Sequence, residues 1–443
     1  MIFGRMRRIV TTLVAFGAVF VVPCHGAQTA SDTLAQELFR RYPFEQWAAA
    51  GEHADIHWSA HVEPVILSNH QRLLTGFQAL IDGREMFKRR GHGEMVVMVR
   101  VTDPLRHSWT AGTYLDLAEI PEQAKSQDWS VIQQAFVLPG EFDAEIAVCD
   151  TQTREYSFAR RKLHVAPLRN DPLPGAWRDL PAVEMIPAYD LPDAWYLPYS
   201  SGQLRLKPRN ERAVHLELLV NITPSERAAG SLRVFRRNMG LLIPAMKSLV
   251  SIGPVDGGMD LSVADLVRHE LVGEQKNIRE LDWSALRKAF SETTPGVVDA
   301  RTLARQRTMK QYFRDQVELH ADTRPGPRVL IVLSAPVVFD KQEDIAPLNL
   351  PPDANRKVIY LRYRPLFPPS RRGGGTIGPG QYALDDDLER ILKPLSPRVF
   401  NAAGPLEFRK ALAYLLEEIA RLGQPGPAVG SAAAVEPGET VRH

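Results

Sequence analysis

One proline-rich segment divides this chain into two parts of different character. Eight prolines lie between residues 166 and 210, and this density prevents regular helix or central strand. Trp177, Trp195 and Tyr196 lie among them, and large apolar rings in a connecting segment usually pack against something. We therefore expect residues 167–210 to form an ordered strap that joins two domains.

The part before the strap is predicted to be an antiparallel β-sandwich of immunoglobulin-like type, over residues 55–166. Six short runs of apolar or alternating character occur there, and turn-forming pairs such as Asp82-Gly83 separate them. Many short strands at this spacing are typical of a sandwich. No stretch in this part resembles a catalytic motif.

The part after the strap, residues 211–423, is predicted to be an α/β doubly wound, Rossmann-type domain. Val214–Val220 is typical of a buried strand and precedes a long helix, and Arg328–Leu333 and Val358–Tyr363 are typical of interior parallel strands. Strands that alternate with helices form a parallel sheet, and ligands bind at the carboxyl ends of its strands. Residues 424–443 have no apolar period and are predicted to be a disordered tail.

The first residues have the three-part pattern of a secretory signal peptide. Three arginines precede an apolar run that ends at Val22, and the small residues Gly26 and Ala27 follow. The apolar run is short for a membrane-spanning helix. We expect cleavage to remove residues 1–27 and to give a secreted or periplasmic protein without stable membrane insertion. Residues 28–54 then form a leading arm with a short helix.

Charge and cysteine content exclude two classes of protein. The chain has 54 basic and 52 acidic residues, and the predicted signal peptide contains three of the basic residues and none of the acidic ones. The remaining charge of −1 gives no electrostatic footprint for nucleic acid. Only Cys149 is left after cleavage, which excludes a disulfide framework. We expect this thiol to be buried and inert.

The loop after the first α/β strand carries the residues that point to a family. It reads NITPS from Asn221 to Ser225, between a buried strand and a long helix. Together with the order of elements over residues 211–423, it resembles a von Willebrand factor A domain, whose first loop carries an Asp-x-Ser-x-Ser motif. A closer resemblance, to the exported von Willebrand A-related proteins of Acidobacteria, is carried by the stretches LELLVNITPSE, PRVFNAAGPLEFRKALAYLLEEIARL and RRKLHVAPL.

The resemblance implies a metal-ion-dependent adhesion site that is degenerate in this chain. In the family, the cation is held by the first Asp, two hydroxyls, a Thr from a second loop and an Asp from a third. Here Asn221 replaces the first acid and Ala335 replaces the last. Neutral ligands alone hold hard cations weakly, so we expect no required cofactor and at most weak Mg²⁺ or Ca²⁺ binding. The implied binding face consists of Asn221, Thr223, Ser225, Thr293 or Thr294, Ser334 and Ala335.

Two functions are open at this point. The sequence contains no recognisable nucleophile–base pair, zinc motif or phosphate loop, so we expect a non-enzymatic protein–protein interaction or adhesion module with an unidentified protein partner. The hydroxyls of the degenerate site could equally well only cap the following helix. The alternative is an enzyme of unfamiliar type that works in the cleft between the domains, with Asp265, His269 and Glu270 as acid–base groups.

Two further patterns are weaker. His53, His57 and His61 recur every four residues, as metal ligands on a helix would, but the residues between them suit a strand edge. We therefore expect isolated surface histidines. The glycine-rich stretch 373–380 contains Pro379 and lacks the following Lys-Ser or Lys-Thr of a phosphate loop, so we expect an ordinary loop.

Overall fold

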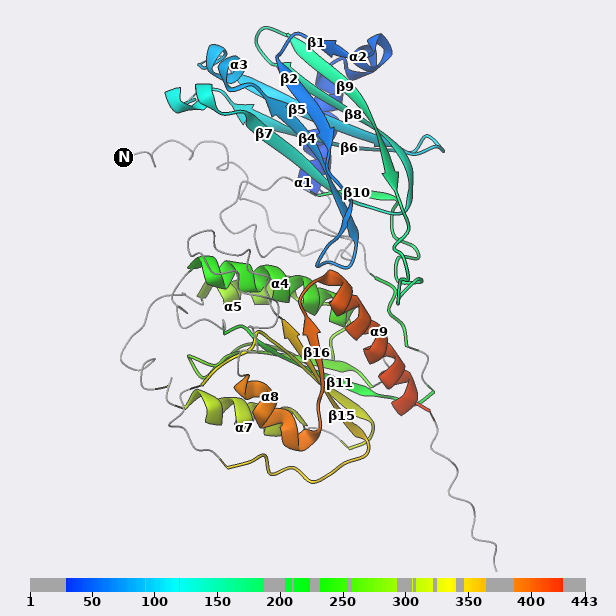
Figure 1. Cartoon of the computed structure of the whole chain (residues 1–443), viewed down its shortest axis with the longest axis vertical. Coiled ribbons are helices and arrows are strands. Elements are labelled where there is room, and N and C mark those ends of the chain that lie inside the picture. The colour runs from blue at the N-terminus through cyan, green and yellow to red at the C-terminus, as the bar shows by residue number, and fades with distance from the viewer. Residues whose placement is uncertain are drawn as a thin grey trace, which may run out of the picture.

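Two bodies of secondary structure lie one above the other along the longest axis of the molecule (Figure 1). The computed structural model describes residues 29–91, 93–118, 120–186, 204–208, 211–223, 232–252, 257–292, 305, 308–321, 325–339, 346–363 and 386–424. The upper body consists mainly of antiparallel strands, and the lower body combines strands with helices. The chain is therefore a multidomain, sheet-rich protein of mixed α/β structure, as the sequence predicts at this level.

The upper body contains two antiparallel sheets. The first runs in the order β1 (His53–Ala54), β9 (Tyr156–Val165), β8 (Gly140–Asp150), β5 (Glu94–Thr102) and β6 (Ser108–Asp116). The second runs in the order β10 (Val183–Met185), β7 (Trp129–Val137), β4 (Leu73–Ile81) and β2 (Trp58–Val62), with β3 (Ile66–Leu67) also paired to β4. Short helices, α3 (Gly83–Lys88) and η1 (Glu122–Ser126), precede β5 and β7.

Strand β5 illustrates how alternation in the sequence builds two separate cores. Val97 and Val99 pack into the core between the two sheets, together with Phe77 from β4. Val96 and Met98 point to the other face of the sheet. A strand that is apolar on both faces therefore lies between two buried layers.

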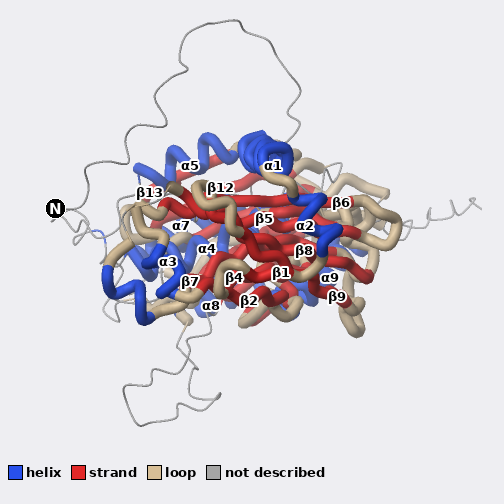
Figure 2. Tube along the Cα trace, turned by 90° about the horizontal axis from the view of Figure 1, so that it is seen from above, coloured by secondary structure: helices blue, strands red, loops and turns tan. Residues whose placement is uncertain are grey.

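The leading arm covers that outer layer. It forms α1 (Thr29–Arg41) and α2 (Phe44–Ala50), which lie beside β5 and β6 (Figure 2). Their residues Leu38 and Phe44 share a core with Val96 and Met98. Gly112 in β6 allows this approach, because a Cβ there would lie 2.5 Å from the Leu38 side chain. The arm is thus packed onto the sandwich by its apolar side.

The lower body is built on one sheet whose strands are parallel except at one edge. Its order is β13 (Glu270–Gln275), β12 (Met259–Asp265), β11 (His215–Asn221), β14 (Arg328–Ser334), β15 (Arg356–Tyr363) and β16 (Arg398–Ala402). Only β13 is antiparallel to its neighbour. The chain first builds outward from β11 on one side and then continues with β14 on the other. This reversal is a topological switch point, where ligands of such sheets bind at the carboxyl ends of the strands.

Helices cover both faces of this sheet (Figure 1). One core includes residues of α4 (Leu232–Val250), α5 (Trp283–Glu292) and α9 (Pro405–Leu422), and the other includes residues of α7 (Met309–Ala321) and α8 (Asp387–Leu392). Strand β11 sends Leu218 into the first core and Leu219 into the second. A short turn, η3 (Lys393–Leu395), follows α8. Among the residues described, no helix combines the length and apolar character needed to span a membrane.

The two bodies meet at a buried arginine. Arg409 in α9 is 0% exposed, and its guanidinium donates to both carboxylate oxygens of Asp171 at 2.6 and 2.8 Å. It also donates to the carbonyl oxygens of Gln71, in the turn before β4, and Leu173. A buried guanidinium with this many acceptors is a strong, geometrically specific contact. It ties the α/β body to both the sandwich and the strap.

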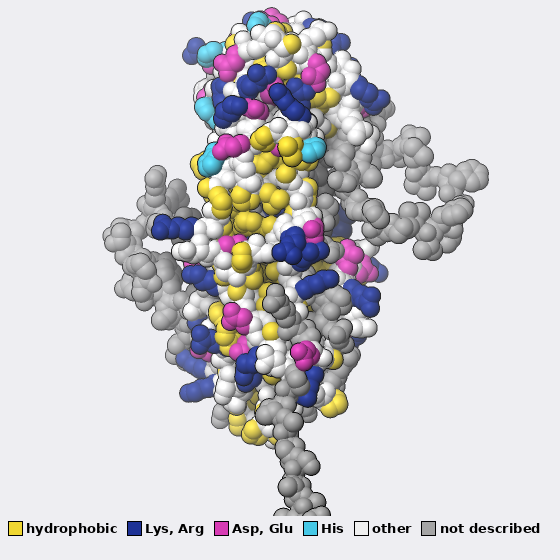
Figure 3. Space-filling model, turned by 90° about the vertical axis from the view of Figure 1, so that its right-hand side faces the viewer, with side chains coloured by type: hydrophobic (Ala, Val, Ile, Leu, Met, Phe, Trp, Pro, Cys, Tyr) yellow, Lys and Arg dark blue, Asp and Glu magenta, His cyan; other side chains and the backbone are white. Residues whose placement is uncertain are grey.

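The described part of the strap is packed, as predicted for its aromatic residues. Trp177 contacts both large cores, its ring lies 4.6 Å from the Arg409 guanidinium, and its Nε1 donates to the Gln71 carbonyl at 2.7 Å. Hydrophobic side chains gather in the middle of the face seen in Figure 3, with charged side chains toward either end. Trp195 and Tyr196 lie outside the described residues.

Candidate functional site

Polar side chains meet at the carboxyl edge of the α/β sheet, where the sequence predicts the binding face. Asn221 ends β11, Ser334 ends β14 and Asp265 ends β12. The Asn221 Nδ2 donates to Ser334 Oγ at 2.8 Å, and its Oδ1 accepts from the Thr223 backbone amide at 2.9 Å. We call Asn221, Thr223, Asp265 and Ser334 the carboxyl-edge cluster.

The Thr223 hydroxyl is also engaged within this cluster. Its Oγ1 donates to Asp265 Oδ1 at 3.4 Å and accepts from the Leu266 backbone amide at 2.8 Å. Asp265 Oδ1 further accepts from the amides of Val267 and Arg268. Burial raises the pKa of Asp265 above its usual value, although these hydrogen bonds and the nearby Arg268 oppose the shift. The carboxylate therefore organises the turn after β12.

The structure brings together part of the predicted set. Asn221, Thr223 and Ser334 lie in one buried network, and each is at most 3% exposed. Ala335 is buried beside them, and its carbonyl accepts from the Ser334 hydroxyl at 2.6 Å. Ser225, Thr293 and Thr294 lie outside the described residues. The one carboxylate of this cluster, Asp265, is supplied by a strand end that the predicted set did not include.

A second network fixes the loop that follows β14. Buried Asp386 accepts from the Val337 backbone amide, from the Tyr360 hydroxyl at 2.9 Å and from Arg362 at 3.1 Å. Burial raises the pKa of Asp386, against the effect of these donors. The neighbouring Asp387 accepts from the Phe339 amide. The loop therefore leaves the sheet edge in a defined direction.

The residues of the alternative acid–base prediction have separate partners. Asp265 is occupied as described, His269 stacks face to face on Tyr312 at 4.9 Å between ring centroids, and Glu270 is exposed. Burial raises the pKa of Tyr312 to about 12, so its hydroxyl stays protonated at neutral pH. None of these groups lines the hollow described below, which lies in the sandwich.

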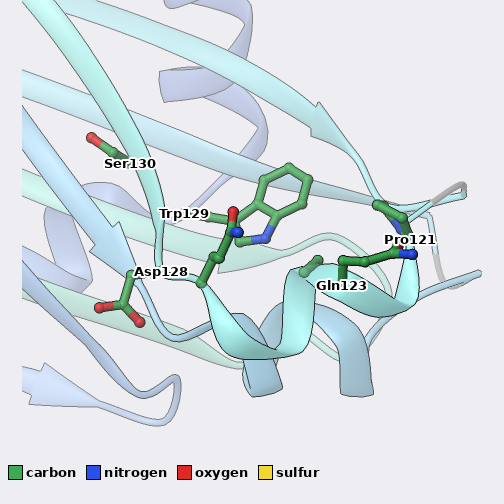
Figure 4. Close-up of a pocket in the computed structure, with 7 residues that line it drawn as sticks. Pro121, Gln123, Asp128, Trp129 and Ser130 are labelled. Carbon is green, nitrogen blue, oxygen red and sulfur yellow. The ribbon is translucent and has the colours of Figure 1, made fainter. Parts of the chain in front are cut away.

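That hollow lies between η1 and the start of β7 (Figure 4). Trp129 forms one wall, and Pro121 and Gln123 lie across from it. Its only carboxylate is that of Asp128. With one acidic side chain and no histidine, cysteine or basic side chain in the lining, the hollow offers no recognisable catalytic set.

No protein-family model matches this chain, and no curated protein matches it either. Site residues are therefore assigned from geometry alone.

The histidine and cysteine patterns resolve into ordinary contacts, whereas the glycine-rich stretch 373–380 lies outside the described residues. His53 and His61 lie on separate strands, β1 and β2, and His57 lies between them, so the three are not on one helix face. His53 contacts Asp55, and the ring of His57 is largely exposed near Asp82. Cys149 is buried and free, and burial raises the pKa of its thiol to about 11, as expected for an inert thiol.

A second polar cluster lies at the opposite, amino edge of the same sheet. His215 and Glu217 lie near the start of β11, Asp260 lies near the start of β12, and His320 lies near the end of α7. His215 Nε2 lies 3.3 Å from Glu217 Oε2 and 3.7 Å from Asp260 Oδ2, and His320 Nδ1 lies 2.7 Å from Glu217 Oε1. All four residues are at most 6% exposed. We call them the amino-edge cluster.

Sequence reasoning missed this cluster, although one signal was present. His215 and Glu217 interrupt a run that otherwise reads as a fully buried strand, and charged groups are rarely buried without partners. The partners could not be identified from sequence, because His320 is 103 positions away from Glu217. Burial would raise the pKa of Glu217, but its contacts with the His215 and His320 rings hold it down at about 2.

Proposed function

We propose that this protein is an exported, non-enzymatic protein-binding module of von Willebrand A-like type that binds its partner without a metal ion. The observation that carries the proposal is the hydrogen bond from the Asn221 amide to Ser334 at the carboxyl edge. A group that donates N–H at the first acid position cannot also offer a carboxylate to a cation. Binding by this face is then direct contact between proteins.

The strand order supports the von Willebrand A-like part of the proposal. Such a domain has a central first strand, an antiparallel edge strand and a first loop at the carboxyl edge. Here β11 lies centrally, β13 is the antiparallel edge, and Asn221 opens the loop after β11. The polar ends of β11 and β14 lie side by side at the switch point, where α/β sheets bind ligands.

The strand order of the upper body supports an immunoglobulin-like sandwich. Strands β2, β4 and β7 lie in one sheet and β5, β8 and β9 in the other, so the chain crosses between the sheets from β4 to β5 and from β7 to β8 as in that fold. The strand β6 extends the second of these sheets. In this proposal the sandwich is a spacer or a second contact.

The loop after β14 provides an exposed apolar contact at the proposed face. Val337 and Phe339 are buried, whereas Val338 between them is 45% exposed. The backbone amides of Val337 and Phe339 are held by Asp386 and Asp387, so Val338 is presented by a fixed backbone. Exposed aliphatic side chains on a rigid loop suit a protein partner better than a small polar substrate.

The test is capture of partners from the native cell envelope by the immobilised chain, with Val338→Glu compared with Leu319→Glu. Leu319 is a matched control, because it is an exposed leucine on α7 near the opposite, amino edge. We expect Val338→Glu to lower the yield of a specific partner at least about tenfold, which corresponds to the roughly 1.4 kcal/mol of one interface contact. Leu319→Glu should leave the yield unchanged.

The metal-free part of the proposal has its own measurement. Added Mg²⁺ should leave the captured amount unchanged. A partner captured only with added Mg²⁺ would overturn metal-free binding at the carboxyl edge, and a partner retained equally by both variants would place binding elsewhere. Turnover of a captured small molecule would favour the enzyme alternative.

A further inference from the structure

The amino-edge cluster has the geometry of a metal site. Three potential ligand atoms, one each from His215, Glu217 and Asp260, lie within 4.8 Å of one another, and all three side chains are buried. Two of the separations are 3.3 and 3.7 Å, both measured from His215 Nε2. Ligand atoms around a tetrahedral ion with bonds of about 2.0–2.1 Å are separated by about 3.3–3.4 Å. The three atoms therefore lie close together, and the 3.3 Å separation matches two ligands of one ion.

The tautomer of His215 makes this convergence unusual. Its Nδ1 lies 3.0 Å from the carbonyl oxygen of Gly257, and a carbonyl oxygen only accepts hydrogen bonds. The proton is therefore on Nδ1, and Nε2 of the neutral ring directs a lone pair toward two carboxylate oxygens. Three acceptors that face one another repel unless a cation lies among them. A metal ion held by all three atoms would remove that repulsion.

The distances favour the metal ion. Charge-assisted N–H···O bonds are usually about 2.7–2.9 Å long. Glu217 makes one such bond, from His320 Nδ1 to its Oε1 at 2.7 Å. Its other oxygen is 3.3 Å from His215, and Asp260 is 3.7 Å from the same nitrogen. These separations are long for an imidazolium that donates to two carboxylates, and the shorter of the two matches the edge of a tetrahedral coordination shell.

The atoms that face away from the centre are all held by hydrogen bonds. Glu217 Oε1 is bonded to His320, His215 Nδ1 to Gly257, and Asp260 Oδ1 accepts from the Asn277 backbone amide at 2.6 Å. Outer partners of this kind fix the orientation of metal ligands in proteins. The register of the sheet also contributes, because Glu217 of β11 lies directly beside Asp260 of β12.

We infer that His215, Glu217 and Asp260 bind a divalent transition-metal ion of the zinc class at the amino edge of the sheet. An imidazole nitrogen with two carboxylates suits Zn²⁺ better than Mg²⁺, which prefers oxygen ligands in octahedral geometry. The site is distinct from the degenerate one, which lies at the other end of β11. Because the site is buried, the ion would link β11 to β12 directly. It would also link both strands to helix α7 through the contact between Glu217 and His320.

The direct test is titration of the full chain, without a histidine tag and after dialysis against chelator, with Zn²⁺ in a calorimeter. We expect one tight ion per chain, confirmed by elemental analysis. Asp260→Asn should weaken binding by more than the roughly 10–100-fold that a change in an outer partner causes, and His320→Gln should fall within that range.

Asp265→Asn is the matched control for Asp260→Asn. Both replace a buried carboxylate of β12 by an amide, but at opposite ends of the strand. Asp265→Asn should bind Zn²⁺ like the unchanged chain, and so should His57→Ala, which tests the surface histidines. Equal affinity of Asp260→Asn and Asp265→Asn would overturn the inference.

A measurement without any variant guards against misfolding of Asp260→Asn. The unchanged chain loaded with Co²⁺ should show the intense visible absorption of a four-coordinate ion with nitrogen and oxygen ligands, and Zn²⁺ should displace it. If neither ion binds to the folded, unchanged chain, the metal site is refuted.

Discussion

The buried polar side chains at the two ends of strand β11 are paired in different ways. Along one face of the strand, His215 and Glu217 lie at the amino edge and Asn221 at the carboxyl edge, with buried Leu219 between them. The carboxyl-edge cluster consists mainly of neutral groups that saturate one another. The amino-edge cluster gathers two carboxylates around one imidazole nitrogen. The residues that could hold a cation thus lie at the amino edge, whereas ligands of such sheets usually bind at the carboxyl edge.

This difference shows that the place of a site in a fold does not determine which ligand groups the site contains. The topology directs attention to the carboxyl edge, because strand ends and loops meet there at the switch point. The ligand chemistry depends only on which side chains occupy those places. At the carboxyl edge an amide and an alanine stand where the resemblance implies acids, so hydrogen bonds replace coordination.

The largest expected effect comes from restoring the missing acids at the carboxyl edge. The double variant Asn221→Asp/Ala335→Asp buries two carboxylates without a neutralising cation, and this should lower the free energy of unfolding by several kcal/mol. If the proposed relation to metal-dependent adhesion sites is right, Mg²⁺ should recover much of that loss. Urea unfolding with and without Mg²⁺ measures both effects.

The control for this variant is the unchanged chain, whose stability should not depend on Mg²⁺ because its carboxyl edge lacks those acids. A double variant that is destabilised equally with and without Mg²⁺ would argue that the loops at this edge no longer have the geometry of a cation site.

The next largest expected effect is on stability, and it compares the loss of one side chain at each end of β11. Glu217→Ala removes the partner of two buried histidines and should lower the free energy of unfolding by about 3–5 kcal/mol. Asn221→Ala leaves the Thr223 amide without its acceptor and should lower it by about 1–3 kcal/mol. Urea unfolding of both variants at one pH gives the ratio. Equal losses would mean that the charged cluster is no more important to the fold than the neutral one.

The smallest effect is a pH dependence at the carboxyl edge. Because burial raises the pKa of Asp265, its ionisation opposes folding above the raised pKa, and this cost is relieved as the pH falls through that value. Asp265→Asn removes the cost, so its stability relative to the unchanged chain should be highest near neutral pH and should decrease with acidification. A tenfold difference in proton affinity between the folded and unfolded chain corresponds to about 1.4 kcal/mol.

Urea unfolding from neutral pH down to the usual carboxyl range measures this trend. Asn221→Ala is the reference, since it removes no titratable group and should differ from the unchanged chain by the same amount at each pH. A constant difference for Asp265→Asn would show that the surrounding amides cancel the effect of burial.

Much of the fold could be predicted from local patterns. The run Val214–Val220 corresponds to β11 (His215–Asn221), and Arg328–Leu333 corresponds to β14 (Arg328–Ser334), because continuous apolar runs suit strands buried on both faces. The short helix predicted in the leading arm is α1 (Thr29–Arg41).

The sites were predictable only where a loop motif marks them. Asn221, Thr223 and Ser334 could be grouped because each follows a recognisable strand in a known order. Asp265 was considered only as an acid–base residue, and its bond to Thr223 depends on how the turn after β12 folds back. The amino-edge cluster carries no motif, since its members come from two strands and a helix that are distant in the sequence.

The sequence alone determined the alternation of strands and helices, the proline-rich division of the chain and the neutral residues at positions 221 and 335. These follow from residue type and spacing, which act over a few residues. Only the tertiary structure decided that Glu217 lies beside Asp260 and beneath His320, because strand register and helix packing are set by the whole core. It likewise decided that Arg409 joins the two bodies, since a buried guanidinium takes its acceptors from wherever folding places them.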